Sequence, residues 1–231
     1  AYTNGFFSGD GTYLKRKESH KACGYMSQKN KKYCKRHSCY ELEDDAPTET
    51  CQAICYTDKP SVTLYNEKIK LLEHLSYRSI GEIVDNKLNV QLNVNIKEKF
   101  YVPMDKSLKS KLEWFSGYID ADGCVVENEE NQSVQVSSIN EQFLINVKYM
   151  LQTCGCNPKI SVASEERKTM LPDGNRGQKE YQCQKLYRLL ITSFDLQTLL
   201  NNGLKTYRLD ITKRDIQRSA GHFVTVKEVI N

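Results

Sequence analysis

No long apolar run occurs in the 231-residue sequence, so we expect no transmembrane helix, which needs about 18 or more such residues. The first residues, Ala1 to Phe7, lack a basic region followed by an apolar core, which argues against a secretion signal. We therefore expect an intracellular protein with no membrane partner. The length fits one large domain or two small ones, and a content of 39% hydrophobic and 27% charged residues is ordinary for a globular protein.

A strong excess of one charge is also missing, since the net charge is only +4. That value is too small to establish a nucleic-acid partner, although a few phosphate contacts need only a local basic cluster. Such a cluster lies between positions 15 and 36, opposed only by Glu18: Lys15, Arg16, Lys17, Lys21, Lys29, Lys31, Lys32, Lys35 and Arg36. It is either a solvated charged loop or an arm that contacts phosphates.

Two short segments share one pattern, an apolar helix-like run that ends in Asp-Gly. The first is Gly5–Thr12 and the second is Gly117–Cys124. Small residues four apart, Gly5 and Gly9 in one and Gly117 and Ala121 in the other, fall on one helical face. We therefore predict that the two helices pack with their backbones close together and that each ends at a glycine in the left-handed conformation.

A similar order of elements follows each motif. In the second half we predict two strands, a helix, two more strands and a short helix: Cys124–Glu127, Ser133–Ser138, Asn140–Cys154, Lys159–Ala163, Gln182–Thr192 and Leu196–Leu200. In the first half we predict the same order at Thr12–Lys17, Val62–Tyr65, Glu67–Leu75, Arg78–Val84 and Lys87–Ile96. The fold class is therefore α+β, with two αββαββα halves at 1–103 and 104–215, an insertion at 18–60 and a tail at 216–231.

One predicted strand carries a row of amides. Between Leu88 and Ile96, apolar residues alternate with Asn89, Gln91, Asn93 and Asn95. Asn and Gln can pair with adenine edges in a major groove, so this face either reads DNA or is merely solvated. Further candidates for DNA contact are Lys15, Lys17, Gln135, Gln182 and Gln184.

The aspartate that ends each motif, Asp10 or Asp122, would lie at the negative end of a helix dipole. A divalent cation between the two would turn this repulsion into attraction. Mg²⁺ takes carboxylate and carbonyl oxygens, and paired metal–carboxylate sites suit attack on a phosphodiester.

The segment Trp114–Gly123 resembles the LAGLIDADG motif of homing endonucleases, and Asn4–Gly11 resembles the degenerate first copy of intein-borne members. The resemblance implies a monomer in which a saddle of antiparallel strands lies on double-stranded DNA and cuts both strands at a long, rare site. It implies that Asp10 and Asp122 bind two or more Mg²⁺ ions, helped by the carbonyls of Gly9 and Ala121. Asp120 has Ser8 as its first-copy counterpart and receives no catalytic role.

The family also uses a basic residue near the end of each half. By this resemblance the catalytic candidates are Lys205 and Lys99, with Lys97 as an alternative to Lys99. Such a lysine could polarise the attacking water or offset phosphate charge.

The tail His222–Ile230 predicts a strand and is similar to the chain that re-enters the splicing domain of an intein. The sequence has no N-terminal Cys or Ser nucleophile and no terminal His-Asn. We therefore expect an endonuclease domain from a larger intein, without self-splicing by this chain.

Nine cysteines are present, an odd number that argues against a disulfide framework in the absence of a secretion signal. In the insertion, Cys23, Cys34, His37 and Cys39 suit a structural zinc, with Cys51, Cys55 or His20 as other fourth ligands. The alternative is a loop with free thiols. For the whole chain, the alternative to an endonuclease is a non-cleaving maturase or regulator that binds DNA or RNA on the same fold.

Overall fold

The computed structural model describes residues 1–21, 33–34, 37–42, 50–93, 95–128, 131–172 and 177–214, and side chains outside 14–58. The chain divides into two compact units. The first comprises Ala1–Tyr101 together with Trp114–Ala121, and the second begins with Val102–Glu113 and continues from Asp122. The tail predicted at 216–231 lies outside the described residues.

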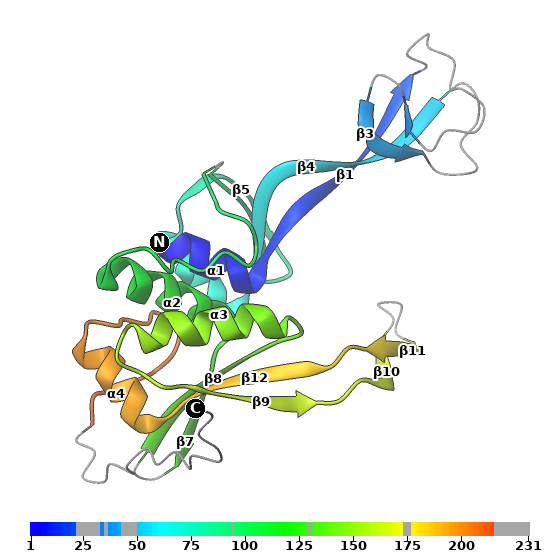
Figure 1. Ribbon diagram of the computed structural model, residues 1–231. Coiled ribbons are helices and arrows are strands. Elements are labelled where there is room, and N and C mark those ends of the chain that lie inside the picture. Colours follow the sequence, from blue (N-terminus) through cyan, green and yellow to red (C-terminus); the bar gives the residue numbers. More distant parts are fainter. Residues whose placement is uncertain are drawn as a thin grey trace, which may run out of the picture. The chain divides into compact units, whose positions relative to one another are not determined.

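The first unit is built on an antiparallel sheet that follows the first motif helix (Figure 1). Its elements are α1 (Tyr2–Asp10), β1 (Gly11–Lys21), β2 (Tyr33–Cys34), β3 (His37–Leu42), β4 (Thr50–Tyr65), the 3-10 helix η1 (Asn66–His74), β5 (Tyr77–Val84) and β6 (Lys87–Leu92). Strand β4 pairs with β1 on one side and with β6 on the other, and β5 is the edge strand beyond β6. Because β1 and β4 stay paired as far as Lys21 and Thr50, the predicted insertion starts as a continuation of this hairpin.

The second unit contains a four-stranded antiparallel sheet with its own helices. Its elements, with the motif helix α2, are α2 (Leu108–Asp122), β7 (Cys124–Asn128), β8 (Asn131–Ser138), α3 (Glu141–Gln152), β9 (Lys159–Ser164), β10 (Arg167–Pro172), β11 (Gln178–Cys183), β12 (Leu186–Ile191) and α4 (Ser193–Asn201). Strands β10 and β11 form a separate two-stranded hairpin between β9 and β12.

The two units repeat one topology. In the first unit the order across the sheet is β1-β4-β6-β5, and in the second it is β7-β8-β12-β9. Leaving aside the inserted strands, each order is first, second, fourth, third. A helix precedes the first strand and another helix joins the second strand to the third. This repeat confirms the α+β class and the internal duplication predicted from the two motifs.

Several predicted elements differ from the structure. The helix predicted at Glu67–Leu75 is a 3-10 helix, and the strand predicted to reach Ile96 ends at Leu92. The segment Gln182–Thr192 is divided between β11 and β12. Among the described residues between β6 and α2 there is no helix, so the first unit lacks the last α of the predicted αββαββα pattern.

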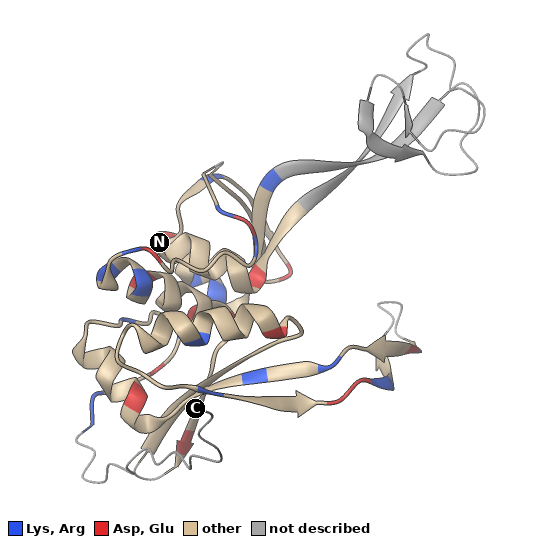
Figure 2. Cartoon of the chain, viewed as in Figure 1, with Lys and Arg blue, Asp and Glu red and all other residues tan. Residues whose placement is uncertain are grey.

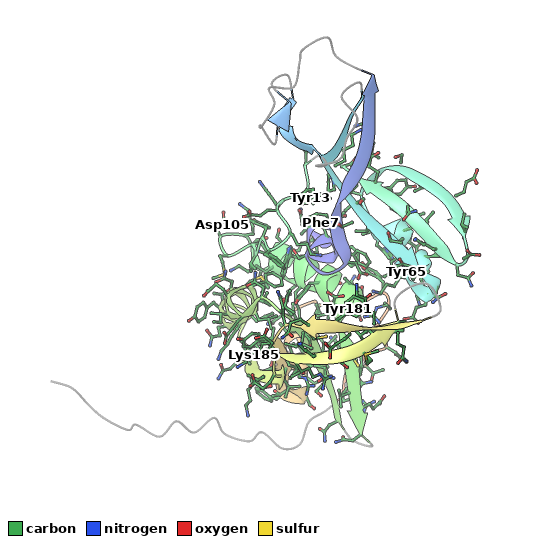
Figure 3. The ribbon with its side chains drawn as sticks, turned by 90° about the vertical axis from the view of Figure 1, so that its right-hand side faces the viewer. Phe7, Tyr13, Tyr65, Asp105, Tyr181 and Lys185 are labelled. Atoms are coloured by element: carbon green, nitrogen blue, oxygen red, sulfur yellow. The ribbon has the colours of Figure 1, made fainter. Side chains whose placement is uncertain are left out.

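The core of each unit is apolar and comes from the faces that the sequence pattern predicts. In the first unit, Phe6 and Phe7 of α1 pack with Leu64 of β4 and with Val90 and Leu92 of β6. Phe7 also meets Tyr13 of β1 edge to face, with ring centroids 5.4 Å apart (Figure 3).

In the second unit, the buried stripe of α3 matches the predicted one: Phe143, Leu144, Val147, Met150 and Leu151. The side chain of Asn140 caps this helix by accepting a hydrogen bond from the backbone N–H of Phe143. Among the described residues, the helices are too short or too polar to cross a membrane.

The first unit contains close packing between α1 and the Trp114–Ala121 part of α2. A Cβ on Gly5 would come 1.8 Å from the carbonyl oxygen of Trp114, and one on Gly117 would come 2.0 Å from that of Tyr2. No side chain fits at either place, so the predicted approach of the two backbones is confirmed.

The predicted left-handed caps are wrong. Gly11 is extended, with φ −71° and ψ 149°, and the only described glycines with positive φ are Gly155 and Gly203. Gly11 is needed for space instead, since a Cβ there would lie 2.2 Å from the carbonyl oxygen of Phe7.

Candidate active site

The first motif ends at Asp10, whose carboxylate meets a lysine from another element. The Nζ atom of Lys68, in η1, donates to Oδ2 of Asp10 at 2.6 Å. The two side chains are only 23% and 20% exposed, so water screens this ion pair less than a fully exposed one.

A left-handed residue starts η1 next to this ion pair. Asn66 has φ 47°, a conformation that Asn tolerates, and its N–H donates to the carbonyl of Asn86 at 2.9 Å. Asn86 and Asp85 also have positive φ, as a two-residue hairpin between β5 and β6 requires. The hydrogen bond therefore ties the start of η1 to this turn, two residues before Lys68.

Lys99 reaches the same helix end through its ammonium group. Its Nζ donates to the carbonyl of Gly9 at 2.6 Å and also to the carbonyl of Gly11. Lys97, the alternative to Lys99, approaches α1 through its backbone instead, since its N–H donates to Oδ1 of Asn4 at 2.7 Å. Of the two lysines, Lys99 is therefore the one whose charge lies at the end of α1.

The donor atoms around Asp10 suit a hard divalent cation. A carboxylate and the carbonyls of Gly9 and Gly11 are all oxygen ligands of the kind that Mg²⁺ takes, and two ammonium groups already approach them. In the described part of the chain, the surroundings of Asp10 included, His, Cys, Asp and Glu residues do not gather in threes around a possible metal position.

The second motif ends at Asp122, which is exposed, after the buried Ala121. A guanidinium nitrogen of Arg208 donates to the carbonyl of Gly123, the residue after the motif aspartate. Arg208 therefore meets the carbonyl that corresponds to Gly11, which Lys99 contacts in the first unit. The predicted Lys205 is exposed, in the segment that follows α4.

Asp120, the other acid of the second motif, lies in the core between the two motif helices. It is fully buried, and its Oδ2 accepts a hydrogen bond from Tyr2 Oη at 2.9 Å. This contact links α1 to α2 within the first unit.

The predicted amide face is partly present on β6. Leu88, Val90 and Leu92 are buried, while Asn89 is exposed and Gln91 half-buried. Neighbouring strands supply hydroxyl groups to these amides. Thr63 Oγ1 donates to Asn89 Oδ1 at 2.9 Å, and Ser79 Oγ donates to Gln91 Oε1 at 3.1 Å. Their side chains line a shallow hollow on this face, together with those of Ser61 and Ile80.

The other two amides of that row, Asn93 and Asn95, lie beyond the end of β6. Asn93 follows β6 and donates from its side chain to Ser76 Oγ, and Asn95 is exposed in a turn. The prediction of four amides on one continuous strand is therefore wrong for these two residues, because pairing of β6 with β5 ends at Leu92.

The glutamines of the second unit lie on separate elements. Gln135 is half-buried on β8, Gln184 is exposed between β11 and β12, and Gln182 on β11 donates to Glu166 at 2.9 Å. The nearby hairpin carries both signs of charge (Figure 2), and its ion pairs join Lys168 to Glu180 at 3.6 Å and Lys185 to Glu165 at 3.2 Å. Two of the basic residues in this region, Lys168 and Lys185, are thus already paired with acidic ones.

The predicted zinc ligands and the basic arm fall where side chains are not described. Cys23 lies outside the described residues, and for Cys34, His37, Cys39, Lys15 and Lys17 the structure describes the backbone only. The zinc site stays a prediction. The described cysteines Cys124, Cys154, Cys156 and Cys183 are free thiols.

Sequence reasoning missed Lys68 and Arg208. A signal for Lys68 was present, because Asn66-Glu67-Lys68 and Asn140-Glu141-Gln142 begin the corresponding helices of the two halves. Arg208 follows Lys205 by three positions, and spacing alone could not choose between them.

A repeated fold with an Asp-Gly motif at the end of each leading helix defines the class of this protein. Residues 109–219 match the family model of the LAGLIDADG-like domain, which places the second half of the chain in the LAGLIDADG family.

A curated relative, the ribonucleoside-diphosphate reductase large subunit of Invertebrate iridescent virus 6, is 35% identical over 230 residues. The match covers 99% of this chain but only 20% of the relative, so the chain spans about a fifth of that protein's length.

Solved structures with a similar chain path include mesophilic variants of the homing endonuclease I-DmoI. They are 13% identical with a TM-score of 0.42, and the match covers 90% of this chain and 96% of theirs. The meganuclease I-SmaMI bound to uncleavable DNA is 10% identical with a TM-score of 0.40, covering 89% and 84%. Full-length DUF199/WhiA from Thermatoga maritima is 13% identical with a TM-score of 0.40, covering 64% and 48%.

Proposed function

We propose that this protein is a metal-dependent endonuclease that cuts both strands of a long, specific DNA site. The observation that carries the proposal is the repeat itself. Each leading helix ends in an aspartate followed by glycine, and each leads into a sheet with the same strand order. In a protein that only binds nucleic acid, two motif carboxylates close to the phosphates would weaken binding, because carboxylates and phosphates repel each other.

In this proposal Asp10 and Asp122 hold Mg²⁺, with main-chain carbonyls of Gly9 and Ala121 as further oxygen ligands. When bound, the metal supplies charge stabilisation for the attacking and leaving oxygens of the phosphodiester. Lys99 and Lys205 offset the charge that develops on the phosphate. In support, the Lys99 ammonium donates hydrogen bonds to the carbonyls of the two glycines on either side of Asp10.

DNA recognition is assigned to the sheet of the first unit. Asn89 and Gln91 point away from the core, and hydroxyl groups hold their oxygens. Amides held in this way can pair with base edges in a major groove. The protein acts as a monomer, because one chain carries both motifs.

We further propose that the chain is the endonuclease part of an intein. In support, the chain matches a fifth of a curated relative whose name describes a different enzyme, a reductase. An inserted domain with its own activity would account for a match of that extent.

The zinc proposal for the insertion rests on the sequence, with Cys23, Cys34, His37 and Cys39 as ligands. Elemental analysis of protein purified without added metal tests it. One zinc per chain supports the site, whereas no zinc with freely titratable cysteines rejects it.

Selection of cleaved molecules from a random DNA library in Mg²⁺ tests the main proposal. We expect one long sequence to be recovered, cut in both strands. Specific binding without any cutting would favour the alternative, a regulator or maturase on the same fold.

A further inference from the structure

Among the residues whose side chains are described, Lys68 places its charge directly on the first motif carboxylate, and it has no assigned role. Its Nζ lies 2.6 Å from Asp10 Oδ2, in a pair of which less than a quarter of either side chain is exposed. A hard divalent cation would need the same carboxylate. Lysine and metal therefore compete for the same carboxylate.

The second half carries a neutral residue at the matching position. Gln142 follows Asn140 and Glu141 as Lys68 follows Asn66 and Glu67, and in each unit this segment comes directly after the second strand of the repeat. The amide of Gln142 donates to Asn146 Oδ1 at 3.2 Å along α3. The repeated fold therefore accommodates glutamine at this position in the second unit, so Lys68→Gln is a suitable substitution for a test in the first unit.

We propose that Lys68 is the resident cation of Asp10 and that a divalent metal binds this carboxylate only by displacing the Lys68 ammonium. This inference rests on the proposed function in one respect, that Asp10 is a metal ligand. Lys68 then neutralises the Asp10 carboxylate as long as no metal is bound. It also lowers the affinity of the first motif for a divalent metal.

The test measures Mn²⁺ binding to the full chain by calorimetry or electron paramagnetic resonance, without DNA. The Mn²⁺ site in question is the one that is lost in Asp10→Asn. Replacing Lys68 by Gln removes the competing ammonium, so the affinity of this site for Mn²⁺ should rise. We expect a rise of at least about fivefold, the lower end of typical couplings between two ligands. Lys68→Arg keeps the charge and should leave the affinity near that of the wild type. Lys70→Gln removes an exposed charge from the same 3-10 helix and serves as the matched control.

An unchanged Mn²⁺ affinity in Lys68→Gln would overturn the inference, and so would an equal rise in Lys70→Gln. The same holds if the rise persists in the double variant Lys68→Gln with Asp10→Asn, because the metal would then bind elsewhere. Circular dichroism of each variant establishes that it is folded.

The two proposals fail in different ways. A wild-type protein that never cuts DNA but shows the predicted change in Mn²⁺ affinity contradicts only the nuclease function. A protein that cuts DNA while Lys68→Gln leaves its metal affinity unchanged contradicts only the role of Lys68.

Discussion

Gly5 and Gly117 occupy equivalent places in one contact between two helices. A Cβ on Gly5 would strike the carbonyl of Trp114, three residues before Gly117, and a Cβ on Gly117 would strike that of Tyr2, three residues before Gly5. The contact is thus reciprocal, as expected when two copies of one motif pack against each other about a local two-fold axis.

Substitution of Gly5 or Gly117 by alanine should destabilise the protein. A methyl group would have to displace backbone atoms rather than a flexible side chain, so we expect a loss at or above about 1–3 kcal/mol, the usual range for overpacking. Urea denaturation monitored by circular dichroism gives the value. Gly81→Ala is the control, because its Cβ would meet its nearest neighbour at 3.5 Å, an ordinary contact. Equal stability of the Gly5 and Gly81 variants would contradict the close packing.

Substitution of Lys99 by alanine should slow DNA cutting without loss of binding. Removal of one electrostatic stabiliser typically costs about 100- to 1000-fold in rate, and Lys205→Ala should behave in the same way. Lys97→Ala is the matched control, since Lys97 uses only its backbone N–H at α1 among the contacts described above. A normal rate for Lys99→Ala combined with a slow Lys97→Ala would reverse the assignment.

Substitution of Asn89 or Gln91 by alanine should relax sequence preference at particular base pairs. Each lost pairing with a base edge removes about 1–3 kcal/mol of discrimination. The measurement is the cleavage profile over single-base variants of the selected site. Gln152→Ala, which removes an exposed amide on α3, should leave the profile unchanged. If the profile is unchanged in all three variants, the β6 face is merely solvated.

The cysteines of the second unit should differ sharply in reactivity. Burial, with the Asp195 charge as a second cause, raises the pKa of Cys156 from 9.0 to about 12. Cys156 therefore keeps its proton at pH 8 while the exposed Cys124 reacts with a thiol reagent. Since the unfolded chain loses this proton at lower pH, folded-state stability should fall as pH rises from 9.0 towards about 12. Rapid labelling of Cys156 in the native protein would contradict its burial.

Local patterns in the sequence predicted the fold where one face of an element is buried. The alternation of Leu88, Val90 and Leu92 gave strand β6, and the apolar stripe from Phe143 to Leu151 gave α3. The pattern also suggested that β6 continues to Ile96, but a strand ends where its partner ends, and β5 pairs with β6 only as far as Leu92. Which strand pairs with which, and how far, depends on the tertiary fold, and the alternation of apolar and polar residues along one strand does not predict it.

The site could be predicted only as far as the motif and the family resemblance reach. The motif indicated Asp10, and the resemblance indicated Lys99, whose ammonium donates to the carbonyls of Gly9 and Gly11 on either side of Asp10. The contact of Lys68 with Asp10 depends on how β4 turns into η1 at Asn66, a residue with positive φ that no periodic pattern indicates. Arg208 likewise meets Gly123 through the path of the chain after α4.

The central claim, that the two motif aspartates carry out metal-dependent DNA cutting, is tested most directly with Asp10→Asn and Asp122→Asn. Each variant is incubated with Mg²⁺ and a plasmid that carries the selected site, and binding to the same site is measured separately. The account predicts that either substitution abolishes double-strand cleavage while affinity for the site stays largely intact. Full double-strand cutting by either variant would contradict it.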